Sequence, residues 1–350
     1  AAHNAGMGYQ TGYYLTTGDY NVAMGSNAML FNQTGSNNTC LGYAAGYGAT
    51  GNSFSNNTLI GANAADAITT GSSNVIMGTN AGGALTSSNY NVLIGVTAGD
   101  AITTGASGTT CVGYNAGSAI TTGGGNTAIG HQAMDALTQG DNNLAIGYNA
   151  MTALSTTDVS DRNIAIGNYA MDGVSTLAAA DNIFIGYNSG GGTWETNTST
   201  QNIGIGNYVL DADMNNAHGN VAIGHNSMSA CTSGAYNTGV GRDTLKAVLA
   251  GASNTAMGNA CLQTVSSGSD NAGFGVAALL NVATKSGNTA IGRGAGRYGG
   301  ATGTSDVGDA VENSTFIGYK TRSLDTTGYD NETVIGSNAC GGGANTVTLG

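Results

Sequence analysis

A short phrase recurs along the whole chain: Asn, two small or β-branched residues, one apolar residue, then Gly. We count 20 copies, and ten of the 19 intervals between their closing glycines are 17 residues long. The closing glycines are residues 8, 25, 42, 61, 78, 95, 113, 130, 147, 167, 186, 206, 224, 241, 258, 275, 292, 318, 336 and 350. A short fixed period over a whole chain predicts a stacked array of repeats rather than a globular domain.

Numbered from the closing Gly as position 0, each repeat predicts one short strand. Position −1 is apolar in every copy, position −3 is rich in Thr, Val and Ile, and position −2 is mostly small, which is the period-two alternation of a strand. We expect the residues at −1 to form the core, including Ile60, Ile94, Ile129, Ile146, Ile166, Ile185, Ile205, Ile223 and Ile291. The small, uncharged side of the strand suggests close approach of a second backbone.

Position −4 is Asn in 16 of the 20 copies. Asn tolerates turn conformations, and stacked identical Asn side chains can also bond one another along an array. The second interpretation predicts an Asn ladder that includes Asn21, Asn38, Asn57, Asn74, Asn91, Asn126, Asn143 and Asn163. A simple turn residue is the alternative.

These patterns predict an all-β chain, a parallel β-solenoid (β-roll) of about 20 coils with a period of 17–20 residues. We expect one solenoid domain over residues 1–350, a piece of a longer fibre chain, with an irregular insertion coil at 293–317. One thin coil cannot stand alone, and the flat small side of the strands needs a cover. A homotrimer, intertwined or side by side, that shares this side around a common axis would supply the cover.

Composition narrows the classes of partner. The 350 residues include 60 Gly and no Pro, and the formal net charge is −12, with no Lys or Arg before Arg162. Such a chain is a poor nucleic-acid binder, because phosphate contacts need Lys and Arg. No stretch approaches 18 consecutive apolar residues, so we expect no membrane insertion.

Two runs carry a resemblance to known proteins: Gly125-Asn-Thr-Ala-Ile-Gly-His-Gln-Ala133 and Asn143-Leu-Ala-Ile-Gly-Tyr-Asn-Ala-Met151. They resemble repeats of bacteriophage tail-fibre and tailspike proteins and are similar to the head repeats of trimeric autotransporter adhesins. The end, Ser314-Thr-Phe-Ile-Gly-Tyr-Lys-Thr-Arg322 through Asn345-Thr-Val-Thr-Leu-Gly350, resembles the stretch before the C-terminal chaperone of phage fibres. The resemblance implies a trimeric parallel β-roll used as a rigid spacer and host-contact surface.

Candidate chemistry is sparse. We find no motif of a hydrolase elbow, phosphate loop or zinc protease, and we predict no catalytic residues, no metal and no cofactor. The five cysteines lie in distant coils, which favours buried small hydrophobes over disulfides. His131 and His225 share position +1 and could meet an axial ion only if that position faced a threefold axis.

The irregular turns are better candidates for binding. The loop 190–199 holds Trp194, the only Trp, and the insertion coil holds Tyr298, so we take both aromatics as candidate ligand contacts. Longer insertions in a solenoid form loops off the regular body, where ligands can be met.

The predicted function is non-enzymatic: the shaft of a phage tail fibre, located in the virion, that binds itself as a homotrimer and a host cell-surface glycan or protein receptor. The alternative is a cellular trimeric adhesin or an extracellular filament subunit at the cell surface. A third hypothesis is a monomeric solenoid that binds a ligand or ice. It requires Thr residues in strict register on one flat exposed face.

Overall fold

The computed structural model describes residues 2–153, 160–173, 179–194, 198–299, 305–306, 311–324 and 330–350. The chain divides into two compact units, Ala1–Ala180 and Asp181–Gly350. Each unit is a parallel β-solenoid, and the described residues contain no helix. The predicted fold class is therefore confirmed.

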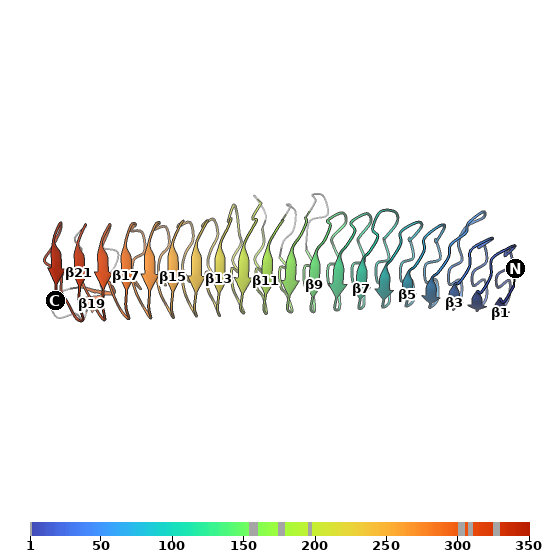
Figure 1. Ribbon diagram of the computed structural model, residues 1–350, viewed down its shortest axis with the longest axis horizontal. Helices are drawn as coiled ribbons and strands as arrows, with labels where there is room; N and C mark the ends of the chain where they lie inside the picture. Colours follow the sequence, from blue (N-terminus) through green and yellow to red (C-terminus); the bar gives the residue numbers. More distant parts are fainter. Residues whose placement is uncertain are drawn as a thin grey trace. The chain divides into compact units, whose positions relative to one another are not determined.

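Each unit contains ten solenoid strands, one per repeat. Successive strands pair in parallel, so the strands of a unit follow one another in sequence order (Figure 1). Ten strands bound nine turns in each unit, about 18 coils with a period near 17 residues. The first unit contains β1 (Ala5–Met7), β2 (Val22–Met24), β3 (Thr39–Leu41), β4 (Thr58–Ile60), β5 (Val75–Met77), β6 (Val92–Ile94), β7 (Thr110–Val112), β8 (Thr127–Ile129), β9 (Leu144–Ile146) and β10 (Ile164–Ile166).

The second unit adds a hairpin to the same plan. Its solenoid strands are β11 (Ile183–Ile185), β12 (Ile203–Ile205), β13 (Val221–Ile223), β14 (Thr238–Val240), β15 (Thr255–Met257), β16 (Ala272–Phe274), β17 (Thr289–Ile291), β20 (Thr315–Ile317), β21 (Thr333–Ile335) and β22 (Val347–Leu349). The two-residue strands β18 (Tyr298–Gly299) and β19 (Ser305–Asp306) pair antiparallel within the insertion coil. In both units the strands pair in register, so each residue of a repeat lies beside the residue at the same repeat position in the next coil.

The chain turns its corners without Pro by using left-handed backbone at three positions of the repeat, −5, +2 and +4. In the repeat that contains β9, these are Asn142 before the strand and Asn149 and Met151 after it, with φ of 58°, 52° and 57°. Asn adopts this region more readily than most residues. Met and Leu pay a steric cost there, which burial of their side chains offsets at position +4.

The core is made by the opposite side of the strand from the one predicted. Every three-residue strand of β2–β17 buries its middle residue, at position −2, between two more exposed ones. Against it pack residues from the facing wall at +3, +4 and +7. Examples are Ala64, Ala98, Ala133, Met134, Met151, Leu245 and Leu262, with Ile68, Ile102, Ile120, Leu137, Val248 and Val265 at +7.

The assignment of the −1 isoleucines to the core is therefore wrong. Ile60, Ile94, Ile146, Ile166 and Ile185 are half-buried, and Ile129, Ile205, Ile223 and Ile291 are exposed on the outer side of the strands. The small −2 side faces the chain's own interior, so it cannot be the side that subunits share. The physical reason is size: a 17-residue coil encloses a thin interior, and only the smaller side of the strand leaves room for the facing wall.

Residue sizes at −2 and +4 compensate for each other within most coils. Where −2 is large, +4 is small: a methyl group added to Gly99 would lie 2.7 Å from Leu93 Cδ2, and one added to Gly190 would lie 2.8 Å from the Phe184 ring. Where +4 is Met or Leu, −2 is Ala or Gly, as in Ala145 with Met151. The thin interior is thus filled to a nearly constant volume, as close packing requires.

This compensation predicts coupled mutations. Leu93→Ala should destabilise the protein by about 2–5 kcal/mol, and Gly99→Met should do so by about 1–3 kcal/mol through overpacking. The double variant should be more stable than the sum of the two single effects predicts, by about 1–3 kcal/mol, because the Met side chain enters the space that Leu93 left. Chemical denaturation of the two single variants and the double variant measures the coupling. Leu93→Ala combined with Gly46→Met, several coils away, should be additive, and equal coupling in both pairs would contradict this packing.

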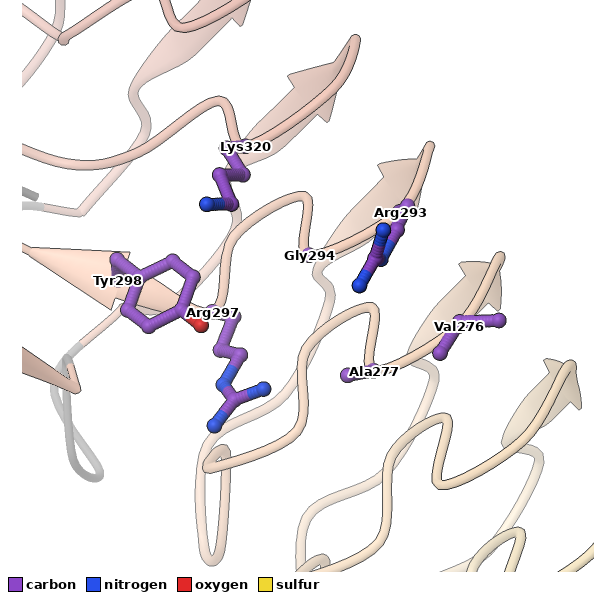
Figure 2. A pocket seen from close by; sticks show the side chains of 7 residues that line it. All are labelled: Val276, Ala277, Arg293, Gly294, Arg297, Tyr298 and Lys320. Atoms are coloured by element: carbon purple, nitrogen blue, oxygen red, sulfur yellow. The ribbon is translucent and has the colours of Figure 1, made fainter.

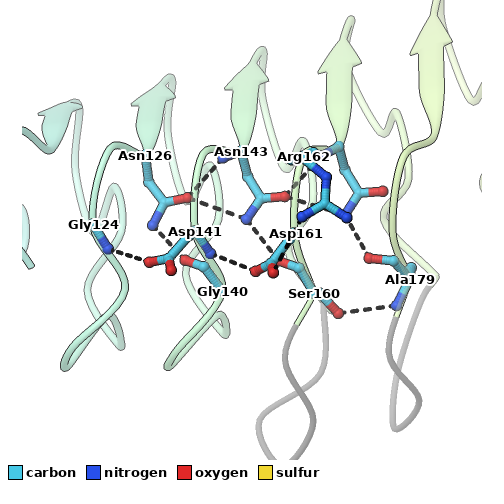
Figure 3. Close-up of polar contacts among 10 residues, drawn as sticks. Gly124, Asn126, Gly140, Asp141, Asn143, Ser160, Asp161, Arg162 and Ala179 are labelled. Atoms are coloured by element: carbon cyan, nitrogen blue, oxygen red, sulfur yellow. Dashed lines mark hydrogen bonds and ion pairs between the residues drawn. The ribbon is translucent and has the colours of Figure 1, made fainter.

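The Asn residues at −4 point inward and form a ladder. Asn143 Nδ2 donates to Asn126 Oδ1 (3.1 Å) and to the Ser160 carbonyl (2.8 Å), and its Oδ1 accepts from the Asn163 N–H (2.9 Å) and Nδ2 (3.1 Å) (Figure 3). The same pattern links Asn21, Asn38, Asn57 and Asn74, whereas Asn91 is joined through its backbone N–H. The side chains of Asn38, Asn57 and Asn143 therefore bond both neighbouring coils and the turn, which a residue serving only its own turn would not do. The ladder is interrupted at Thr109: its N–H donates to Asn91 Oδ1 (2.9 Å), and Asn91 Nδ2 has no partner among the described residues.

A second ladder runs at position −6 with the opposite polarity. The Gly124 N–H donates to Asp141 Oδ1 (2.7 Å), and the Asp141 N–H donates to Asp161 Oδ1 (2.8 Å) (Figure 3). Ser and Asn take the same place earlier in the chain, as in the bond from the Asp19 N–H to Ser36 Oγ. Polar turn residues thus satisfy backbone groups that the short strands leave unpaired.

Candidate functional site

The outer side of the strands is the largest candidate surface. None of the twenty residues at −1 is buried, and they are all Met, Leu, Ile, Val or Phe. Ile129 is 37% exposed and Ile291 is 45% exposed. Because the strands stack about 4.8 Å apart, the ten strands of one unit present an apolar ribbon on the order of 45 Å long. We call this the outer ribbon, formed by positions −1 and −3 of the solenoid strands.

Aromatic side chains at +1 and +2 stack beside the outer ribbon. In the first unit His131 lies between Tyr114 and Tyr148, with ring centroids 5.1 Å apart on both sides. In the second unit His225 meets Tyr208 edge-on at 5.9 Å. Both histidines thus belong to surface stacks. Among the described residues, no group of three His, Cys, Asp or Glu side chains could hold a metal ion.

Four of the five cysteines are buried free thiols. Cys40 and Cys111 take the −2 place that Ala holds in other coils, and Cys340 is half-buried. Burial raises the pKa of the Cys40, Cys111, Cys231 and Cys261 thiols to about 12. These thiols are therefore protonated near neutral pH and pack as small hydrophobes.

Five acids occupy position +5: Asp66, Asp100, Asp135 and Asp172 in the first unit and Asp211 in the second. Partial burial raises the pKa of each, and that of Asp172 reaches about 6. The coulombic effect of Asp100 raises the pKa of Asp66 further. Glycosidase-like chemistry needs two carboxylates facing one cleft, and neither of the two pockets described below contains an Asp or Glu.

Trp194 does not form a ligand contact. Its side chain is 1% exposed and packs edge-on against Phe184, with ring centroids 5.7 Å apart. Phe184 is the −2 residue of β11, so the irregular loop returns its aromatic to the core of its own coil. The prediction of a sugar-stacking Trp194 is wrong because the interior, opened by Gly190 at +4, offers the indole an apolar site.

The insertion coil 293–317 departs from the regular solenoid through the hairpin of β18 and β19. Residues 300–304 and 307–310 of this coil lie outside the described residues. Tyr298, the other predicted contact, is half-buried, and the Arg297 guanidinium lies 4.8 Å from the centre of its ring. Unlike Trp194, Tyr298 borders open space.

That space is a pocket of about 150 Å³ on the second unit. The pocket is lined by residues of the turns after β16, β17 and β20 and by Tyr298 of β18 (Figure 2). The lining residues are Val276, Ala277, Arg293, Gly294, Arg297, Tyr298 and Lys320. Three of the eight bases of the chain meet there, and no acid is found among the described residues that line the pocket. A second pocket, of about 190 Å³, lies over β1 and is lined by Asn4, Leu15, Met29 and their neighbours. The sequence showed the arginines in one irregular coil, but Lys320 joins them only because β20 stacks on β17.

No family model matches the chain, and comparison with curated proteins finds no relative. No helix of the described residues is long or apolar enough to cross a membrane. Two features of the described residues are candidates for function: the outer ribbon and the pocket lined by Arg293, Arg297 and Lys320.

Proposed function

We propose that this chain is the shaft of a homotrimeric attachment fibre, of the phage tail-fibre type, that acts as a rigid non-enzymatic rod and presents weak binding sites in three copies. The repeats that resemble fibre and adhesin repeats support this proposal, as does a solenoid in which each coil bonds its neighbours through backbone and Asn side chains. Three copies of a weak site raise the overall affinity without new contacts.

The observation that carries the proposal is the outer ribbon. Solenoid strands with one solvated face would carry polar residues there, whereas −1 is apolar in all twenty copies. With the side chains at −1 and −3, Thr included, the ribbon of one unit covers on the order of 450 Å². This is the size of the largest apolar patch on a typical monomer, and such patches are often functional. A second copy of the same chain is the natural cover because its ribbon has the same spacing. The subunits therefore meet through positions −1 and −3, not through the small −2 side.

The first test is the mass in solution by light scattering after size exclusion. We expect about 103 kDa, three times the chain mass of 34.4 kDa. Ile129→Lys with Ile223→Lys places one charge on the ribbon of each unit, and we expect it to give a 34.4 kDa species with an unchanged β-sheet circular dichroism spectrum. Gln139→Lys, at an exposed turn, is the control and should stay trimeric. A monomeric wild type would exclude the fibre, and a mass of two chains would replace the trimer by a dimer.

A monomeric solenoid that binds an extended surface such as ice is the second candidate. One observation favours it: Thr at −3 stands in register on the outer side in several neighbouring coils, as in Thr110 beside Thr127 and Thr238 beside Thr255. The row is interrupted by Val, Ile and Leu, as at Val92 and Leu144. A monomeric mass together with thermal hysteresis of the freezing point would establish this function in place of the fibre.

A further inference from the structure

We propose that the pocket lined by Arg293, Arg297, Tyr298 and Lys320 binds an anionic saccharide, a sugar ring that carries a carboxylate, sulfate or phosphate. The inference rests on the proposed attachment function only for its biological use, since it names the chemistry of the surface that the fibre would meet. The binding itself requires only the second unit.

Charge is the first argument. The whole chain carries −12, yet Arg293, Arg297 and Lys320 all line this pocket, and none of its described lining residues is an acid. Two described acids lie between Tyr298 and Lys320 in the chain. Asp306 pairs with Tyr298 in the β18–β19 hairpin, and Glu312 is engaged by Lys285 at 3.3 Å. A fixed cluster of positive groups on an otherwise acidic molecule concentrates the field at one place and favours a small anion over an extended polyanion.

The donor types support the same ligand. The Arg guanidinium presents N–H groups in a planar fork that matches carboxylate, sulfate and phosphate oxygens, and the Lys ammonium adds a compact charge. Arg293 stands at +1 after β17 and Lys320 at +2 after β20, so adjacent coils hold them at neighbouring levels of the stack. Among the described residues, neither side chain forms an ion pair, and the Lys320 Nζ lies 5.3 Å from the centre of the Tyr319 ring.

The apolar part of the pocket suits a sugar ring. Tyr298 and Val276 border the same space, and Val276 is 45% exposed. Arg297 holds the Tyr298 ring by a cation–π contact, which orients it beside the pocket. Gly294 leaves the floor open: a methyl group added there would meet only Lys320 Cγ and Tyr298 Cε2, both at 3.6 Å. An apolar wall beside a cation cluster can contact the C–H face of a pyranose while the bases hold its charged substituent.

The experiment uses the full chain and a series of ligands that share one ring. Binding of D-glucose, D-glucuronic acid, glucose 6-sulfate, glucose 6-phosphate and inorganic phosphate is measured by calorimetry or ligand-observed NMR. We expect millimolar or tighter Kd, an affinity of about 4 kcal/mol, for at least one anionic sugar, and at least about tenfold weaker binding of glucose. The order among the three anionic sugars identifies the charged group.

Variants assign the binding to this pocket. The double variant Arg293→Gln with Lys320→Gln should bind the preferred anionic sugar at least about tenfold more weakly, which is about 1.4 kcal/mol of binding free energy. Arg242→Gln, which removes a base from the same +1 position three coils earlier, should leave the Kd unchanged. Tyr298→Leu should weaken the binding of the sugars but leave the binding of inorganic phosphate unchanged.

Three results would overturn the inference: glucose binding as tightly as the anionic sugars, an Arg293/Lys320 double variant that still binds, or inorganic phosphate binding as tightly as glucose 6-phosphate with no effect of Tyr298→Leu. The last result would leave a plain anion site. Light scattering on the same samples separates the two proposals, because a monomer that binds anionic sugar refutes only the fibre, and a trimer that does not bind refutes only the pocket.

Discussion

Replacing Gly130 by Ala should destabilise the first unit by at least about 4 kcal/mol, an unusually large effect for one methyl group. Gly130 closes the eighth repeat with φ of 141°, a region that is essentially restricted to Gly. The added methyl carbon would lie 2.2 Å from the Gly147 carbonyl oxygen in the next coil. Neither backbone can yield without breaking the bond from the Gly147 N–H to the Ile129 carbonyl (2.9 Å).

Guanidinium denaturation followed by circular dichroism measures this effect, and hydrogen exchange should show lost protection around β8 and β9. Gly51→Ala is the matched control: Gly51 also has positive φ, 89°, but no atom lies within 4 Å of the added methyl group. We expect about 1–2 kcal/mol there, from backbone strain alone. Similar losses in the two variants would show that conformational strain, rather than the close approach of the next coil, explains the invariant Gly.

Replacing Asn143 by Ala should cost on the order of 4 kcal/mol. The change removes two donors and one acceptor that serve Asn126 Oδ1, the Ser160 carbonyl and Asn163. Asn126 Oδ1 still accepts from the backbone N–H of residue 143, but the Ser160 carbonyl and the Asn163 N–H lose these bonds in a buried place. Each orphaned polar group costs about 1–3 kcal/mol. Because the bonds join three successive coils, we expect the loss to appear as reduced cooperativity as well as a lower midpoint of denaturation.

Two variants sharpen this prediction. Asn168→Ala removes an exposed Asn whose Oδ1 accepts one bond, from the Tyr148 N–H, and it should cost about 1 kcal/mol or less. Asn143→Asp keeps the acceptor for the Asn163 N–H but loses both donors and buries a charge. Burial raises the pKa of such a carboxyl, so its stability should fall as pH rises through that pKa and recover partly in acid. An Asp variant as stable as wild type at neutral pH would contradict the ladder's energetic role.

The sequence alone determined the repeat-level structure. A period near 17 residues, an apolar–small–apolar alternation and an invariant Gly are enough to predict short parallel strands stacked in register. The small side of the strand and its closing Gly indicated close approach of a second backbone. The next coil is that backbone, because a methyl group added to Gly130 would overlap the Gly147 carbonyl oxygen. Local geometry decides these features, so every copy of the repeat carries the signal.

Only the tertiary structure decided which side of each strand faces inward. Period-two alternation separates the two faces of a strand, but it does not tell which face is buried when neither face is charged. Size alone then favours the larger apolar residues as the core, and this prediction is wrong. Which face is buried depends on the facing wall of the coil, where Met151 or Leu245 at +4 fills the space that a small −2 residue leaves. The same holds for single residues: Trp194 is buried because Gly190 opens the core beside Phe184, and Lys320 reaches the pocket of Arg293 because β20 stacks on β17 across a 26-residue interval. The Trp194 contact lies within one irregular coil and the Lys320 contact joins two adjacent coils, and the spacing of the repeat encodes neither.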